Sequence, residues 1–151
     1  ILLSKALCDL NLNDKAYKYL NFLNPIIKTI DRNGANVYRK EPYIIPSKIE
    51  FRDGVLFKII NEDFNYPSSL FYRVCIQNIL GFNLCSEGFY IDPHIPSNWK
   101  SYVMEYKRED AFYKIIVRRG ENKSLKINGE KYVENFIEFD KEGDYIIDIT
   151  I

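Results

Sequence analysis

The two halves of this chain meet at Ile91-Asp92-Pro93-His94-Ile95-Pro96-Ser97-Asn98-Trp99. This stretch holds two prolines together with the single histidine and the single tryptophan of the 151 residues. Each proline fixes its own φ angle and favours extended geometry in the residue before it. The stretch is therefore predicted to be a stiff, non-helical strap, held to a core by Ile91, Ile95 and Trp99.

Before the strap, apolar residues recur at helical spacing. Residues 1–7 have a helix-compatible pattern, and a second helix is predicted to begin at Asn13-Asp14 and to end at Asn24-Pro25. We expect a long connection after it, with a turn at Asn33-Gly34. This half therefore starts with two short helices.

The second part of this half combines a hairpin with a helix. Strands are predicted at 49–52 and 55–60, around an Asp-Gly turn, which is typical of a β-hairpin. A third helix is predicted to start at Ser68 or Ser69, with a serine hydroxyl as its N-cap, and to stop at Gly81.

After the strap, apolar and polar residues alternate as in half-buried strands. Asn128-Gly129 is a strong type I′ hairpin signal, and five or six short strands at this spacing favour an antiparallel sandwich. The predicted fold class is therefore α+β, with residues 1–87 forming helices and loops and residues 88–151 forming a β-sandwich.

The composition excludes several function classes. Acidic and basic residues number 21 each, without a basic stripe, so nucleic acid is not expected as a partner. Cys8, Cys75 and Cys85 have neither zinc-site nor paired spacing and are predicted to be reduced thiols in the cytoplasm. No apolar run approaches the roughly 20 residues of a membrane span. The start at Ile1 is typical of a piece of a longer protein.

Five short pieces of the sequence occur together in a recognisable order. They are Asp14-Lys15-Ala16 leading into Leu23-Asn24-Pro25-Ile26, then Tyr38-Arg39-Lys40-Glu41-Pro42-Tyr43, Tyr72-Arg73, Ile79-Leu80-Gly81-Phe82 and the strap. Their order and spacing resemble the C-terminal end of glycoside hydrolase family 94, which contains cellobiose and related glycoside phosphorylases and the phosphorylase-like domain of cyclic β-1,2-glucan synthases. The pieces are more similar to those of the glucan synthases than to those of the free disaccharide phosphorylases.

The resemblance implies that the helices are the last ones of an (α/α)₆ barrel and that the sandwich is the C-terminal β-domain of the family. In the family, a carboxylic acid protonates the glycosidic oxygen while phosphate attacks the anomeric carbon. That aspartate lies upstream of the matching region, so this chain is expected to hold no catalytic residue and to be inactive alone. Inorganic phosphate is the implied co-substrate of the parent enzyme, with no other cofactor and no metal.

Partners follow from the same resemblance. They are a β-glucan or oligosaccharide, the missing N-terminal part of the same polypeptide and a second copy of the chain. The parent could be attached to the inner membrane through other domains.

Two groups of residues are candidate site residues. Glu41 matches a family glutamate that contacts the acceptor sugar, and Tyr43 belongs to the same motif. A carboxylate beside a proline can accept hydrogen bonds from two sugar hydroxyls, whereas a solvated loop glutamate is the alternative. Ser68 and Ser69 follow a segment that lacks the histidine and glycines of the family's phosphate loop. They could bind an oxyanion, although helix capping is favoured, and phosphorolysis is in doubt.

Packing is the simpler interpretation of the remaining conspicuous residues, and two other roles of the chain stay open. His94 and Trp99 are interpreted as packing residues, since a lone histidine without an acid or cysteine at ligand spacing is usually structural. The high aromatic content suits a β-rich core or a sugar-binding surface. The sandwich could therefore be an independent carbohydrate-binding module, or the whole chain a structural remnant of a barrel.

Overall fold

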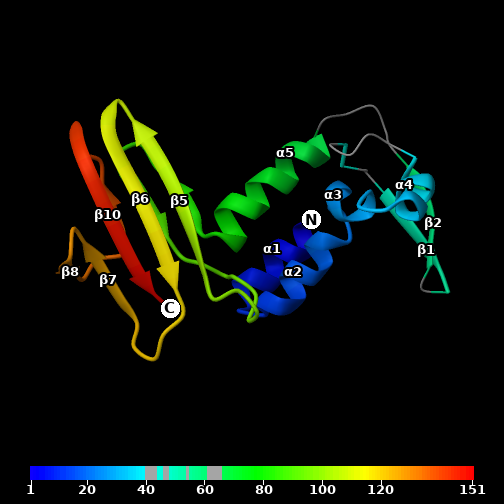
Figure 1. Cartoon of the computed structure of the whole chain (residues 1–151), viewed down its shortest axis with the longest axis horizontal. Helices are drawn as coiled ribbons and strands as arrows, with labels where there is room; N and C mark the ends of the chain where they lie inside the picture. Colours follow the sequence, from blue (N-terminus) through cyan, green and yellow to red (C-terminus); the bar gives the residue numbers. More distant parts are fainter. Residues whose placement is uncertain (40–43, 46–47, 54, 61–65) are drawn as a thin grey trace. The chain divides into compact units, whose positions relative to one another are not determined.

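The computed structural model describes residues 1–39, 44–45, 48–53, 55–60 and 66–151, and its fold is mixed α+β (Figure 1). The chain divides into two compact units, Ile1–Ile79 and Leu80–Ile151. The first strand of the second unit begins at Phe82, so this unit starts ahead of the boundary expected at residue 88. Five α-helices occur among the described residues, and they close no barrel.

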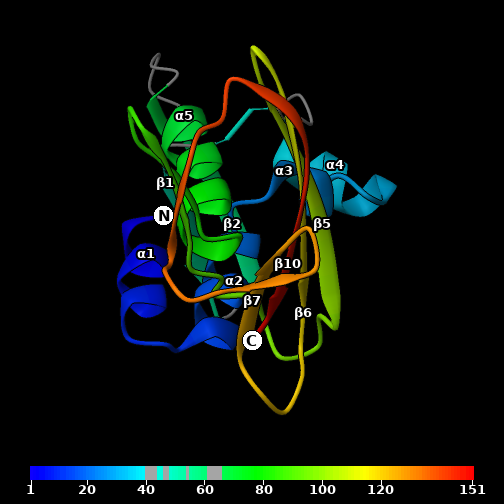
Figure 2. The same cartoon turned by 90° about the vertical axis from the view of Figure 1, so that its left-hand side faces the viewer.

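The core of the first unit forms where its helices pack. α1 (Leu2–Asp9) and α2 (Asn13–Asn21) lie side by side in Figures 1 and 2, and both contact η1 (Val74–Ile79). The predicted apolar spacing is confirmed, because the inward positions of all three elements are buried. These core residues are Cys8, Ala16, Leu20, Val74 and Ile79.

Two short helices occupy the region expected to be a long connection. The Asn24 side chain accepts a hydrogen bond from the N–H of Ile26 and caps α3 (Pro25–Lys28). The Asp31 carboxylate accepts one from the N–H of Gly34, at 2.7 Å, and caps α4 (Arg32–Tyr38). The turn predicted at Asn33-Gly34 is wrong: these residues form the first turn of α4, because Asp31 supplies the N-cap.

The hairpin and the third helix follow. β1 (Lys48–Arg52) pairs antiparallel with β2 (Val55–Ile60), which confirms the predicted hairpin. α5 (Tyr66–Arg73) then continues directly into η1, a π-helical segment, so the helix runs to Ile79 nearly as expected. Gly81 follows with a φ of +73°, a conformation that only glycine adopts without strain.

The second unit is a sandwich of two sheets. The larger sheet has the strand order β5-β6-β10-β7-β8, and the smaller one has the order β3-β4-β9. Figures 1 and 2 both show β5, β6 and β10 side by side. The strands are β3 (Phe82–Leu84), β4 (Gly88–Ile91), β5 (Ser101–Arg108), β6 (Asp110–Arg118), β7 (Ser124–Ile127), β8 (Glu130–Tyr132), β9 (Phe136–Glu138) and β10 (Glu142–Thr150).

One strand pairing corrects the expected antiparallel arrangement. β10 runs parallel to β6, with Ile147 opposite Ile115, and antiparallel to β7 on its other side. The chain leaves β6, forms the β7–β8 hairpin, contributes β9 to the other sheet and returns between β6 and β7. The alternation of side chains predicts which face is buried but not the direction of the neighbouring strand, so the mixed sheet was not foreseen.

Aromatic rings from both sheets form the sandwich core. Phe89 on β4 is fully buried, and its ring lies 5.4 Å from that of Tyr113 on β6 in an edge-to-face arrangement. Phe82 and Tyr106 make a similar contact at 5.2 Å between their centroids. Such pairs each add about 0.5–1.5 kcal/mol beyond area burial. Most aromatic side chains of this unit therefore pack between the two sheets.

Candidate functional site

The C-terminal end of α4 frames the segment that carries the predicted sugar contacts. The Tyr38 hydroxyl donates a hydrogen bond to the carbonyl oxygen of Ile44, and the Tyr38 side chain is buried. Burial raises the pKa of Tyr38 to about 12, so the phenol stays protonated and remains a donor at neutral pH. Arg39 ends the helix in the left-handed region, with its N–H bonded to the carbonyl of Ala35. Residues on both sides of the segment are thereby fixed.

Glu41 and Tyr43 lie outside the described residues. Their assignment as acceptor-sugar contacts stays a prediction. Their described neighbours Tyr38 and Ile44 belong to the first unit, and Ile45 next to them is buried as well.

Ser68 and Ser69 lie inside α5 rather than ahead of it. The helix begins at Tyr66, so neither serine is its N-cap, and the capping prediction is wrong at these positions. Ser68 is half-buried and Ser69 is exposed in the first turn. Pro67 beside them has no N–H, which leaves fewer backbone donors for an anion than an ordinary helix start offers. Oxyanion binding by these serines remains a prediction.

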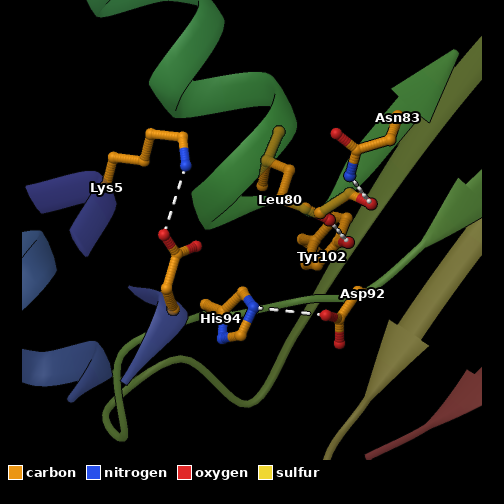
Figure 3. A network of polar contacts seen from close by, with 8 residues as sticks. Lys5, Leu80, Asn83, Asp92, His94 and Tyr102 are labelled. Atoms are coloured by element: carbon orange, nitrogen blue, oxygen red, sulfur yellow. Dashed lines mark hydrogen bonds and ion pairs between the residues drawn. The ribbon is translucent and has the colours of Figure 1, made fainter. Parts of the chain in front are cut away.

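Figure 3 shows polar contacts in the first part of the second unit, one of them within the strap. Nε2 of His94 lies 3.4 Å from a carboxylate oxygen of Asp92, and the histidine side chain is 14% exposed. Tyr102 donates its hydroxyl to the carbonyl oxygen of Leu80, and the side-chain amide of Asn83 donates to that of Gly81. Among the described residues, no three His, Cys, Asp or Glu side chains are placed to hold a metal ion.

Arg119 is the anchor of the strap that sequence reasoning missed. Its guanidinium donates to the carbonyl oxygens of Ile95 at 2.8 Å, Trp99 at 3.0 Å and Pro96 at 3.1 Å. Ile95 is fully buried, so the strap is fixed by an apolar side chain and by this fork. No spacing or motif in the sequence marks Arg119, because its contacts join residues 20 to 24 positions apart.

Cys8 and Cys75 carry no reactive thiolate at neutral pH. Cys8 and Cys75 are free thiols in the core of the first unit, where burial raises the pKa of each to about 11. Both are therefore neutral at neutral pH and act as small apolar groups.

Comparison with known proteins gives one informative similarity. The chain is 24% identical over 106 residues to the cyclic beta-(1,2)-glucan synthase NdvB of Rhizobium meliloti (strain 1021). The similarity covers 70% of the chain. The chain itself spans about 4% of the length of that relative. A comparison with protein-family models finds no match. Within the described residues, no helix combines the length and the apolar character needed to cross a membrane.

Proposed function

We propose that this chain is part of a carbohydrate-active enzyme related to the cyclic β-1,2-glucan synthases, and that it contributes the acceptor side of the active site. The observation that carries the proposal is the similarity over 106 residues to a cyclic beta-(1,2)-glucan synthase. The order of the five sequence pieces is consistent with it. In this proposal the chain belongs to a larger protein that acts on a β-glucan or oligosaccharide.

Glu41 and Tyr43 are the proposed acceptor contacts. The hydrogen bond between Tyr38 and Ile44 supports this role, because it fixes the chain on both sides of the segment. A carboxylate accepts hydrogen bonds from two neighbouring sugar hydroxyls, and such charge-assisted bonds are about twice as strong as neutral ones. The catalytic acid, in this proposal, is an aspartate of the larger protein.

Glucosyl transfer to a sugar is favoured over phosphorolysis. The segment that aligns with the family's glycine-rich loop contains β2, and Pro67 removes a backbone donor at the start of α5. A phosphate cradle needs closely approaching backbone N–H groups, which glycines usually provide. Inorganic phosphate therefore stays the weaker proposed co-substrate, with Ser68 and Ser69 as its candidate contacts.

Exposed apolar side chains on the first unit support the proposed larger protein. Leu10, Ile26 and Ile30 are 68%, 69% and 80% exposed. Single exposed apolar residues are ordinary, whereas a contiguous apolar patch marks an interaction site, and we propose that these three side chains belong to one such surface. We assign this surface to the remaining helices of the same polypeptide. If the isolated chain self-associates through this surface, Ile30→Glu should weaken the association. Sedimentation velocity measures the difference between the variant and wild type.

The direct test is turnover by the isolated chain. Glucosyl transfer and phosphate release are measured with β-1,2-linked glucans, with and without inorganic phosphate. We expect no turnover above the buffer blank, because the proposed catalytic acid lies elsewhere. Turnover proportional to protein concentration, and lost on heat denaturation, would contradict the proposal that the chemistry resides outside this chain.

The second candidate function is a carbohydrate-binding sandwich module. One observation favours it: the second unit has its own aromatic core, closed around Phe89 and Tyr113. A unit with its own core can fold and bind a ligand without the first unit. This candidate and the enzyme proposal are compatible.

A further inference from the structure

The outward face of the small sheet carries an aromatic pair that no proposed site uses. Asn83, Tyr90 and Phe136 stand opposite one another on β3, β4 and β9. Side chains alternate along a strand, so these three point away from the core, which holds Phe89 and Ile137. The Tyr90 and Phe136 rings lie 4.7 Å apart with a tilt of 44°. We call this pair the aromatic strip.

A glycine lets the Phe136 ring lie against the sheet. Gly88 occupies the outward position beside Tyr90 on β4, opposite Glu138. A Cβ at Gly88 would lie 2.6 Å from Cζ of Phe136 and 2.2 Å from the carbonyl oxygen of Ile137. Real Cβ atoms do not approach other atoms this closely, so only glycine leaves room for the Phe136 ring against the sheet. The ring therefore lies low and extends the surface of Tyr90.

Polar groups border the aromatic strip. Tyr90 is 40% exposed, and its hydroxyl makes no hydrogen bond within the described part of the chain. The Glu138 carboxylate is exposed on the same face, two residue pairs along the strands. The Asn83 side chain is held by its bond to the Gly81 carbonyl oxygen, at 3.2 Å. An apolar aromatic centre is thus combined with hydrogen-bonding groups at its margin.

We propose that the aromatic strip binds a pyranose unit of a β-linked glucan. A pyranose has an apolar C–H face, which can stack on the exposed Tyr90 ring beside Phe136, and a rim of hydroxyls that can bond to Tyr90 and Glu138. The choice of a glucan rests on the proposed function, whereas the sugar class follows from this surface. A neutral ligand fits better than an anion, since the outward position beside the strip holds a carboxylate.

The size of the strip argues against a protein partner. An aromatic side chain buries about 150–250 Å² when fully covered, so the two rings supply at most about 500 Å². Specific protein interfaces bury about 1,200 Å² or more in total. A single sugar ring, by contrast, needs no larger platform than this.

The test is a titration of the full chain with linear β-1,2-glucan oligosaccharides, followed by NMR or calorimetry. Wild-type binding is expected at a Kd of about 1 mM, as for a shallow site. Tyr90→Leu keeps an apolar contact with Phe136 but removes the aromatic face, and should weaken binding about tenfold or more. Tyr90→Phe should lose only about threefold, and Glu138→Gln a similar amount.

Tyr19 provides the matched control. It is 44% exposed on α2 and has an aromatic neighbour, Phe22, at 5.9 Å, but it lies in the other unit. Tyr19→Leu should leave the titration unchanged. Thermal unfolding of each variant verifies that Tyr90→Leu is folded under the conditions of the titration.

Three results would overturn the proposal. They are the absence of wild-type binding at 20 times the expected Kd of about 1 mM, unchanged binding in Tyr90→Leu, and an equal loss in Tyr19→Leu. A change of oligomeric state in Tyr90→Leu without loss of sugar binding would indicate a protein interface instead. Failure here is distinguishable from failure of the proposed enzyme function, because turnover by the larger protein and its dependence on Glu41 do not involve the strip.

Discussion

The hydroxyl of Tyr38, the last residue of α4, is hydrogen-bonded to the carbonyl oxygen of Ile44. This bond joins the two ends of the segment that carries Glu41 and Tyr43. Because Tyr38 is buried and its phenol stays protonated, the bond persists throughout the neutral pH range. The buried Tyr38 side chain thus fixes Ile44, the residue that follows Tyr43 in the chain.

Removing this hydroxyl should cost stability. Tyr38→Phe leaves the Ile44 carbonyl without its partner, and we expect the free energy of unfolding to fall by about 1–2 kcal/mol. Urea denaturation followed by circular dichroism measures the change. Tyr72→Phe is the control, since Tyr72 is 66% exposed and no hydrogen bond of its hydroxyl occurs among the described residues. Equal stability of Tyr38→Phe and wild type would contradict the role of this bond.

Alkaline pH should destabilise the protein through its buried thiols. The pKa of Cys8 and of Cys75 is raised from 9.0 to about 11 by burial, so the unfolded chain releases these protons first. Their contribution to stability is therefore complete below pH 9 and is lost as the pH rises through about 11. Urea denaturation at a series of pH values measures the slope.

The double variant Cys8→Ala/Cys75→Ala isolates this effect. Its unfolding free energy should be lower at neutral pH, because core volume is lost, but it should decline less steeply above pH 9. An unchanged slope in the double variant would show that other groups, such as Tyr38, cause the alkaline loss.

Gly81 should tolerate no side chain. Its φ of +73° is strained for other residues, and a Cβ there would lie 2.0 Å from the carbonyl oxygen of Asp92. We expect Gly81→Ala to destabilise the protein by about 2 kcal/mol or more. Gly129 is a matched control, because its φ is +86° but nothing lies within 4 Å of its would-be Cβ. Gly129→Ala should cost about 1 kcal/mol, and equal losses would refute a role for the close contact.

The strap should loosen when Arg119 is changed. Arg119→Met removes the three hydrogen bonds that the guanidinium donates to strap carbonyls, including the carbonyl of Trp99. We expect it to lower the free energy of unfolding by about 2 kcal/mol. Trp99 is the single tryptophan, so its fluorescence reports on the strap directly. We expect a red shift of the emission in Arg119→Met and no recovery in Arg119→Lys, because an ammonium group lacks the planar fork. Unaltered emission in both variants would rule out Arg119 as the anchor.

Local patterns predicted the elements better than their pairing. The hairpin β1–β2, the apolar face of α2 and the stop at Gly81 follow from short-range turn and spacing signals, and all are confirmed. The parallel pairing of β10 with β6 depends on where a later strand enters the sheet. Such a choice is made by tertiary packing, which leaves no local signature in the sequence.

The other two incorrect predictions concern the starts of helices α4 and α5. The Asn-Gly pair after Arg32 is usually a turn signal, but Asp31 caps the N–H of Gly34 and converts it into the first turn of α4. Serines are good N-caps, yet α5 starts two residues before Ser68. The sequence motif predicted Glu41 and Tyr43 as site residues. The hydrogen bond between Tyr38 and Ile44 has no sequence signal and is seen only in the folded structure.

The most direct measurement is the kcat/KM for glucosyl transfer by the larger enzyme carrying Glu41→Gln. The amide keeps the shape of the side chain but removes the charge that strengthens two sugar hydrogen bonds, so kcat/KM should fall about tenfold or more, with unfolding unchanged. Glu121→Gln, an exposed glutamate between β6 and β7, serves as the control and should keep full activity. A kcat/KM within about twofold of wild type for Glu41→Gln would contradict the proposal that this chain supplies the acceptor side of a glucan-active site.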